Sequence, residues 1–206
     1  MRKRRPISRE IGTPRDTGLI VIASEDRYAV RQYFEMFETT RIQFHFLETT
    51  DGKSAPQHVM ARLDEYLEEY DIGEEDHLWF VGDTDHWTDA GHIANLKSVV
   101  QQCKQKGIGV ALSNPCFDLW LLLHFSDVPS SVPLKCDEIG ELIRRSTGSF
   151  NKRRVYDLDI SNAAVLTAID RADAIRQTYE VIPSKLGTNV DQIVRELYQR
   201  RMISIR

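Results

Sequence analysis

The sequence predicts an α/β protein in which helices flank a parallel sheet of about four strands, followed by a C-terminal helical extension. Two observations lead to this fold class. Between residues 18 and 127, four short apolar runs alternate with segments of helical periodicity, as in strand–helix–strand units. After residue 127 no further run of the strand type follows, and patterns of helical spacing dominate the rest of the chain.

Each apolar run has the features of a strand buried in a sheet. GLIVIASE at 18–25 and HLWFVGDTD at 77–85 contain continuous apolar stretches, IQFHFLET at 42–49 alternates, and IGVALSN at 108–114 comes last. A helical segment separates each run from the next, and crossovers of this kind join parallel strands. The sheet is therefore predicted to be parallel.

Several helix boundaries can also be predicted. Pro56 is expected to open the second helix, and Gly107 to follow the end of the third. CFDLWLLLHF at 116–125 is apolar nearly all round, which indicates a buried helix. Asn114 is expected to cap this helix, with Pro115 in its first turn. The amide groups at its start would then face the ends of the strands, where they suit a phosphate.

The chain is predicted to have three parts. Residues 1–17 form a flexible basic arm, 18–127 the α/β domain, and 128–206 a helical extension packed on that domain. The clearest helical patterns of the extension lie at 161–179 and 188–198.

The composition narrows the class of protein. Of 206 residues, 41% are hydrophobic and 28% charged, as in ordinary globular proteins. There is no apolar run of about 18 residues and no signal-peptide pattern, so we expect no membrane association and a cytoplasmic location. Cys103, Cys116 and Cys136 are odd in number and lack metal-ligand spacing, which favours a reducing cytoplasm, and thus free thiols, over a disulfide framework. The oligomeric state is left open.

Charge is spread unevenly along the chain. The net charge of −4 excludes a globally basic nucleic-acid-binding protein, but the arm is strongly basic and can reach for phosphate. Basic termini are as often merely solvated. A second basic cluster consists of Arg144, Arg145, Lys152, Arg153 and Arg154. We expect this basic cluster to contact nucleic acid, which the acidic segment 63–76 would repel.

Acidic side chains follow two of the predicted strands. Glu25 follows the first strand, and Asp83 and Asp85 follow the third. Ligands of open parallel sheets sit at these strand ends, and residues two apart in an extended segment share a face. Crowded carboxylates repel one another, and a hard cation relieves that repulsion. The pattern therefore predicts a Mg²⁺ or Mn²⁺ site for phosphoryl chemistry. Alternatively, Asp83 merely caps the helix that follows it.

Two sets of residues resemble known families. A glutamate after the first strand and Asp-x-Asp after the third are similar to the signature of the Toprim fold, found in topoisomerases, primases and OLD nucleases. SNPCFDLWLLLHF at 113–125 closely resembles the signature of RloB-like proteins, the group that includes the second component of the AbiL abortive-infection system. Lys152 and Thr188-Asn189-Val190 also match that family's pattern. The resemblance covers nearly the whole chain from residue 18.

The chain departs from the family pattern at one place. SEDRYAV stands where the family usually has a Glu-Gly-Glu-Lys-Thr-Glu-like run. Glu25 keeps the position of the essential glutamate, but the neighbouring glycine and lysine are absent. The difference affects the expected geometry of this loop, and with it the choice of substrate, more than metal binding.

The resemblance implies a function and a division of roles. It implies a Toprim-type, Mg²⁺- or Mn²⁺-dependent nuclease that cleaves RNA or DNA in anti-phage defence, together with an ATPase partner of the AAA or ABC type. Glu25, Asp83 and Asp85 would hold the metal, and Lys152 would neutralise the transition-state phosphate.

Several other residues near this centre have more than one interpretation. Asn114 and Thr188 are candidates for binding a phosphate or supporting the site. Asp118 either forms a structural hydrogen bond or adds a further carboxylate beside the metal. His86 either orients a phosphate or accepts a proton, or is simply a surface histidine. His124 is interpreted as a buried core histidine rather than a catalytic base.

Two other functions fit parts of the pattern. A receiver-like signalling module also binds Mg²⁺ through acids after its first and third strands, but has no role for Asp85 or for the C-terminal extension. A non-catalytic adaptor would bind nucleic acid through its basic arm. Metal-dependent turnover distinguishes the nuclease from both, and phosphorylation of Asp83 would identify the receiver.

Overall fold

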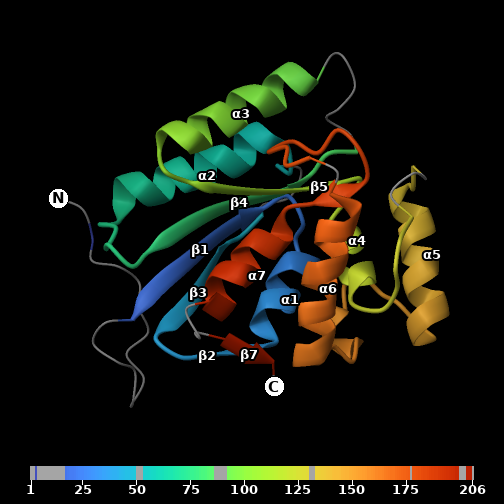
Figure 1. Ribbon diagram of the computed structural model, residues 1–206. Coiled ribbons are helices and arrows are strands. Elements are labelled where there is room, and N and C mark those ends of the chain that lie inside the picture. Colours follow the sequence, from blue (N-terminus) through green and yellow to red (C-terminus); the bar gives the residue numbers. More distant parts are fainter. Residues whose placement is uncertain are drawn as a thin grey trace.

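A five-stranded sheet between two layers of helices forms the centre of the molecule (Figure 1). The computed structural model describes residues 3, 17–49, 53–85, 92–129, 133–176, 178–199 and 203–205. The strand order is β3-β1-β4-β5-β6. The strands are β1 (Gly18–Ser24), β3 (Ile42–Leu47), β4 (His77–Asp83), β5 (Gly109–Asn114) and β6 (Gly187–Thr188). The first four are parallel and β6 runs antiparallel to β5, so the predicted fold class is confirmed.

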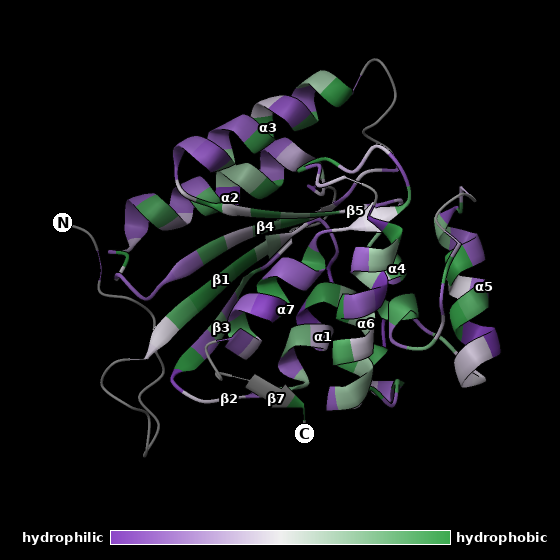
Figure 2. Ribbon diagram, in the orientation of Figure 1, coloured by the Kyte–Doolittle hydropathy of each residue, from purple (hydrophilic) through white to green (hydrophobic). Residues whose placement is uncertain are grey.

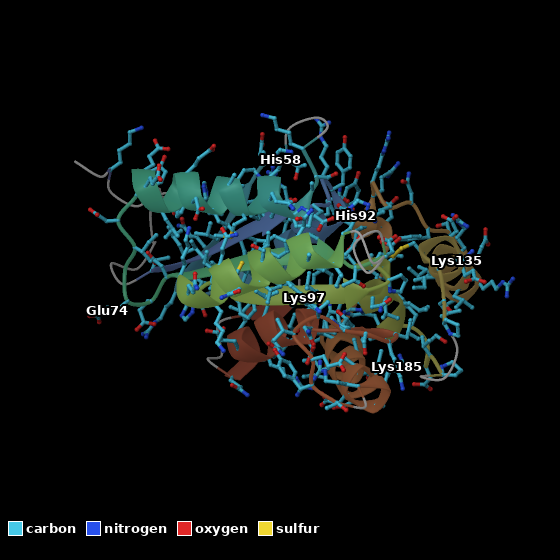
Figure 3. The ribbon with its side chains drawn as sticks, turned by 90° about the horizontal axis from the view of Figure 1, so that it is seen from above. His58, Glu74, His92, Lys97, Lys135 and Lys185 are labelled. Atoms are coloured by element: carbon cyan, nitrogen blue, oxygen red, sulfur yellow. A yellow bond between two sulfur atoms is a disulfide. The ribbon has the colours of Figure 1, made fainter. Side chains whose placement is uncertain are left out.

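The helices cover both faces of the sheet. One layer holds α2 (Pro56–Glu69) and α3 (Ile93–Gln105), which run side by side across the sheet when seen from above (Figure 3). The other layer holds α1 (Ala29–Glu35), α4 (Asp118–Leu123), α6 (Asn162–Ile175) and α7 (Val190–Gln199). At the edge of the second layer, α5 (Cys136–Thr147) packs against α4, and a short 3₁₀ helix, η1 (Val155–Asp157), follows it.

The packing of β1 explains why its sequence is apolar up to its last residue, Ser24. Ile20 and Ile22 pack against the layer of α1 and α4, whereas Leu19 and Val21 pack against α2 and α3. Figure 2 shows most of this strand in the hydrophobic colour. Because both faces are covered, the interior positions of the strand carry apolar side chains, and a polar side chain occurs only at its end, at Ser24.

The predicted boundaries of two helices are confirmed. Pro56 is the first residue of α2, where its missing N–H leaves no bond unmade. The third helix ends at Gln105, and Gly107 has a φ of 69°, the left-handed conformation that favours glycine after a helix.

Two short strands in the C-terminal part were not predicted. β6 pairs through Thr188 with Ser113 and through Gly187 with Asn114. β7 (Ile203–Ile205) pairs with β2 (Phe37–Thr39). The prediction that strands stop after residue 127 was therefore wrong, because strands of two or three residues give no periodic signal.

The helix in SNPCFDLWLLLHF begins later than predicted. It starts at Asp118, so Asn114 does not cap it and Pro115 is not in its first turn. The Pro115 carbonyl instead accepts hydrogen bonds from the backbone N–H groups of Thr84 and Asp85, each at 3.1 Å. These bonds tie the segment before α4 to the end of β4, which leaves it unable to enter the helix.

The cysteines differ from the sequence prediction as well. Cys116 and Cys136 form a disulfide between the segment before α4 and the first residue of α5, and Cys103 is a buried free thiol. The prediction of free thiols was wrong for this pair. Sequence spacing could not reveal it, because the two residues are brought together only by the packing of α5 on α4.

The basic arm lies mostly outside the described residues. Its Lys3 donates its backbone N–H to the Glu69 carbonyl at 2.7 Å, and its ammonium forms an ion pair with the Glu69 carboxylate. At this position the arm contacts an acidic side chain of α2. Within the part of the chain that the structure describes, no helix is long and apolar enough to cross a membrane.

His124 is a buried core histidine, as predicted. It is 4% exposed, and its Nδ1 lies 2.9 Å from the Trp120 carbonyl, which can only accept. Nδ1 therefore carries the proton of the neutral ring, and Nε2 accepts from the Tyr33 hydroxyl at 3.2 Å. Burial lowers the pKa of His124 to about 4 although its backbone hydrogen bonds oppose that shift.

We expect His124 to make the folded protein less stable in acid. Between pH 6.5 and about 4 the unfolded chain binds a proton at His124 and the folded protein does not, so unfolding becomes easier as the pH falls. The loss in unfolding free energy that His124 causes reaches about 3 kcal/mol near pH 4. Urea unfolding of the wild type and His124→Gln between pH 7 and 4.5 measures it.

The difference in unfolding free energy between these two proteins should shrink as the pH falls. The exposed His58 provides the matched control, since His58→Gln should follow the wild type at every pH. A difference for His124→Gln that stays constant over this range would contradict the prediction.

Candidate active site

The strand order creates a switch point between β1 and β4. The chain passes from β1 to β3 on one side of it and then crosses back to β4 on the other side. Open α/β sheets bind ligands at the carboxyl ends of the strands at such a point. Glu25 and Asp26 follow β1, and Asp83 and Asp85 end and follow β4, so four carboxyl groups lie beside this switch point.

Glu25 lies next to β4, as predicted from the expected neighbourhood of the two strands. Ser24 pairs with Val81, and the Glu25 backbone N–H donates to the Val81 carbonyl at 3.3 Å. A Cβ at Gly82 would come within 2.8 Å of Glu25 Oε1, so the glycine leaves room for this carboxylate. Arg62 of α2 donates to the Ser24 carbonyl at 2.7 Å, and its guanidinium attracts the Glu25 carboxylate electrostatically.

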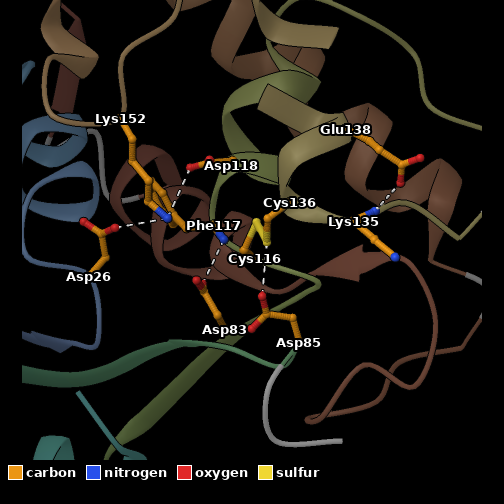
Figure 4. The surroundings of a disulfide bond; sticks show 10 residues. All are labelled: Asp26, Asp83, Asp85, Cys116, Phe117, Asp118, Lys135, Cys136, Glu138 and Lys152. Carbon is orange, nitrogen blue, oxygen red and sulfur yellow. Dashed lines mark hydrogen bonds and ion pairs between the residues drawn. A yellow bond between two sulfur atoms is a disulfide. The ribbon is translucent and has the colours of Figure 1, made fainter. Parts of the chain in front are cut away.

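Asp83 is held at the start of α4. Its Oδ1 accepts the Phe117 backbone N–H at 2.9 Å (Figure 4). Burial raises the pKa of the Asp83 carboxyl to about 7, against the opposing effects of Lys152 and of this amide. The neighbouring charges of Asp26 and Asp85 raise that pKa further. The carboxyl is thus placed where an additional positive charge would stabilise its ionised form.

Asp85 faces a different neighbour. Its Oδ2 lies 3.4 Å from Cys136 Sγ of the disulfide (Figure 4). Asp83 and Asp85 therefore make different contacts, although the charge of Asp85 still acts on the Asp83 carboxyl. Within the described ranges, no three histidine, cysteine or acidic side chains are grouped closely enough to hold a metal ion.

Lys152 joins the acids of two elements. Its Nζ lies 3.2 Å from Asp26 Oδ2 and 3.7 Å from Asp118 Oδ1 (Figure 4). Burial lowers the pKa of this lysine, but the carboxylates of Asp118, Asp83 and Asp26 outweigh that effect and raise it above its usual value. The ammonium therefore stays charged at any working pH.

Asp118 and Asp26 position this lysine. Asp118 is 5% exposed; burial raises its carboxyl pKa, and the Lys152 charge opposes that. Asp26 accepts the backbone N–H groups of Tyr28 and Ala29 through Oδ1, which leaves Oδ2 for Lys152. Asp26 was missed as a site residue. The available signal was an aspartate directly before a helical segment, where it can cap.

Two predicted phosphate-binding candidates have structural partners. The Asn114 side chain donates to the Pro183 carbonyl at 2.9 Å. The Thr188 hydroxyl lies 2.7 Å from the Ser113 hydroxyl and accepts the Val190 N–H at the start of α7. His86 lies outside the described residues.

The basic cluster is divided between several places. Arg144 and Arg145 lie in the last turn of α5, and Arg144 forms an ion pair with Glu141. Arg154 pairs with Asp157 at 2.9 Å. Lys152 enters the candidate site, and the guanidinium of Arg153 lies over the Tyr28 ring, 5.8 Å from its centroid.

The donors at this edge fit a hard cation by their chemistry. Glu25, Asp83 and Asp85 offer only carboxylate oxygens, the ligands that Mg²⁺ and Mn²⁺ prefer. These three would hold the ion once their side chains turn toward it, because Lys152 already binds Asp26 and Asp118.

Comparison with known proteins adds one finding. The model of the family described as "RloB-like protein" matches residues 20–197, which include Glu25, Asp83, Asp118 and Lys152. None of the curated proteins and none of the solved structures compared with the chain matches it. The family match spans most of the sequence, and the chain therefore belongs to the RloB-like family.

Proposed function

We propose that this protein is a metal-dependent nuclease that hydrolyses phosphodiester bonds of RNA or DNA in anti-phage defence. The observation that carries the proposal is the meeting, at one switch point, of carboxyl groups from β1 and β4 with the charged Lys152. Membership of the RloB-like family is consistent with a role in defence. The proposal includes a Toprim-type centre, an AbiL-like setting, and an ATPase partner of the AAA or ABC type that controls cleavage.

In this mechanism the protein's own groups bind and orient the phosphate. Glu25, Asp83 and Asp85 would hold Mg²⁺ or Mn²⁺, which when bound supplies polarisation of the phosphodiester and activation of water. Lys152 is fixed by Asp26 and Asp118, so its ammonium can face a phosphate oxygen with little loss of conformational entropy. A fixed cation of this kind stabilises charge that develops on the phosphate oxygens in the transition state.

A receiver-like module shares part of this arrangement. It also needs an aspartate after a central strand with a lysine nearby, as Asp83 and Lys152 are here. However, the Asp83 Oδ1 accepts an amide hydrogen bond at the start of α4, and the fifth strand is antiparallel. These features favour the nuclease.

The first test is cleavage by the purified protein. Mixed tRNA, single-stranded RNA and plasmid DNA would each be incubated with Mg²⁺, Mn²⁺ or EDTA. We expect cleavage of at least one substrate that needs the metal and is abolished in the Asp83→Asn/Asp85→Asn double variant. Binding of Mn²⁺, followed by electron paramagnetic resonance, should be lost in the same variant.

The matched control replaces two exposed acidic residues that precede β4, at the opposite end of this strand from the site. The Asp71→Asn/Glu74→Gln double variant should cleave and bind Mn²⁺ like the wild type. Cleavage that persists in the Asp83/Asp85 double variant would overturn the mechanism. Mn²⁺ binding without any cleavage, together with phosphorylation of Asp83 by acetyl phosphate, would favour the receiver instead.

A further inference from the structure

A pocket of about 350 Å³ lies beside the candidate active site. The ends of β1 and β3, the loop after β1 and one side of α1 form its walls, and the proposed mechanism does not use it. Asp26 lines the pocket and also binds Lys152. The pocket and the site therefore share this side chain.

Flat side chains form two walls of the pocket. Tyr28 is 37% exposed, and the guanidiniums of Arg27 and Arg153 lie 5.5 and 5.8 Å from the centre of its ring. On the β3 side, the Arg31 guanidinium lies over the Phe46 ring at 5.9 Å. Aromatic rings and guanidinium planes are the surfaces on which unpaired nucleobases stack.

Acidic side chains fix the orientation of one of these planes. Arg31 Nε lies 2.7 Å from Glu35 Oε1, and its Nη1 lies 3.6 Å from Glu48 Oε1. Both glutamates line the pocket, where their oxygens can accept hydrogen bonds from the amino groups at a base edge.

The loop that carries Lys152 is anchored to the same helix. Gln32 of α1 donates through Nε2 to the Arg153 carbonyl at 2.9 Å and accepts the Val155 N–H through Oε1 at 2.7 Å. Both ends of this side chain are thus used to hold the loop beside the pocket. Helix α1 therefore fixes the position of Lys152 relative to the pocket. A ligand that contacts both would need such a fixed spacing.

The charges of the pocket favour a neutral occupant. Its lining contains the arginines Arg27 and Arg31 and the acids Asp26, Glu35 and Glu48. The three acidic side chains repel a phosphate, whereas a flat, uncharged group with hydrogen-bond donors at its edge fits beside them. A nucleobase has this chemistry, and its own phosphate would lie toward Lys152.

We propose that this pocket binds the base of one nucleotide of a single-stranded nucleic acid, with Tyr28 as the main stacking surface and the adjoining phosphate toward Lys152. The inference deepens the proposed function by naming the substrate class. A base inside a duplex could reach the pocket only after leaving its stack, so single strands are favoured.

The test measures binding of short single-stranded RNA and DNA oligonucleotides by fluorescence anisotropy. The Asp83→Asn/Asp85→Asn background prevents cleavage, and all titrations would be done without metal and with Mg²⁺. We expect Tyr28→Ala to weaken binding about 10- to 100-fold and Phe46→Ala to weaken it less. Tyr179→Ala removes a more exposed aromatic ring outside the pocket and should leave the affinity unchanged.

An abasic scan adds a readout that a merely structural role of Tyr28 would not change. Removing the base at one position should weaken binding to the background protein, and Tyr28→Ala should then cause no further loss. Equal losses from Tyr28→Ala with intact and abasic oligonucleotides would overturn the proposal. So would Tyr28-dependent binding of free mononucleotides with no effect on oligonucleotides, since the pocket would then serve a soluble nucleotide.

These outcomes are separate from those of the cleavage test. If wild-type protein never cleaves but binds oligonucleotides with the expected dependence on Tyr28 and on one base, the pocket stands and the nuclease does not. If it cleaves while Tyr28→Ala binds normally, the nuclease stands and the pocket proposal is overturned. Melting temperatures of all variants would confirm that they are folded.

Discussion

Replacing Lys152 by methionine should lower metal-dependent cleavage at least about 100-fold, the usual effect of removing one group that stabilises transition-state charge. Methionine keeps most of the length of the side chain but removes the ammonium that lies between Asp26 and Asp118. The change also leaves these carboxylates and Asp83 without their nearest shared cation. Single-turnover rates at saturating substrate would separate this loss from weaker binding.

The conservative variant shows whether charge or packing is responsible. Lys152→Arg keeps the positive charge but carries it on a planar guanidinium, so it should recover part of the cleavage rate. Lys97 is an exposed lysine of α3 (Figure 3), a helix of the layer opposite to α4, whose Asp118 contacts Lys152, so Lys97→Met should cleave like the wild type. A wild-type rate for Lys152→Met would remove this lysine from the mechanism.

The largest effect on stability is expected for Asp191→Ala, at about 3–5 kcal/mol. Asp191 is fully buried near the start of α7 and accepts hydrogen bonds from Arg176 through Oδ1 and, at 3.0 Å, from Arg195 through Oδ2. Alanine would leave two guanidiniums facing each other without the carboxylate between them. Urea unfolding near pH 7 measures the loss.

Asp173 provides the matched control for this variant. It contacts the same two arginines, but its side chain is 52% exposed. Water can replace it, so Asp173→Ala should cost less than about 1 kcal/mol. Similar losses in unfolding free energy for Asp191→Ala and Asp173→Ala would contradict the argument that burial makes the contacts of Asp191 more important for stability.

The sequence was sufficient for the four parallel strands of the sheet and for one edge of the site. Continuous apolar runs such as 18–25 are long enough to identify strands, and parallel strands place their ends together. Glu25 and Asp83 could therefore be brought to one edge without coordinates. The same reasoning identified His124 as a core residue, because a polar group within an apolar helix needs buried partners.

What could not be predicted depends on contacts between distant segments. Asp26 became a site residue only because Lys152, more than a hundred positions later, lies beside it. The start of α4 shifted because the Pro115 carbonyl bonds to the end of β4. Neither the disulfide of Cys116 nor the pairing of β6 leaves a local pattern, since both arise from packing across the fold.

The position of α4 in the chain has a consequence for synthesis. Every residue of this helix is buried, yet its partners α5 and α6 are made after it, as is β6, which covers the edge of β5. While the ribosome is still adding the last third of the chain, four strands and an apolar helix are already complete and partly uncovered. Such surfaces associate with other chains, so a nascent chain halted near residue 127 should aggregate or bind chaperones. The protein can protect its own core only once it is almost entirely made.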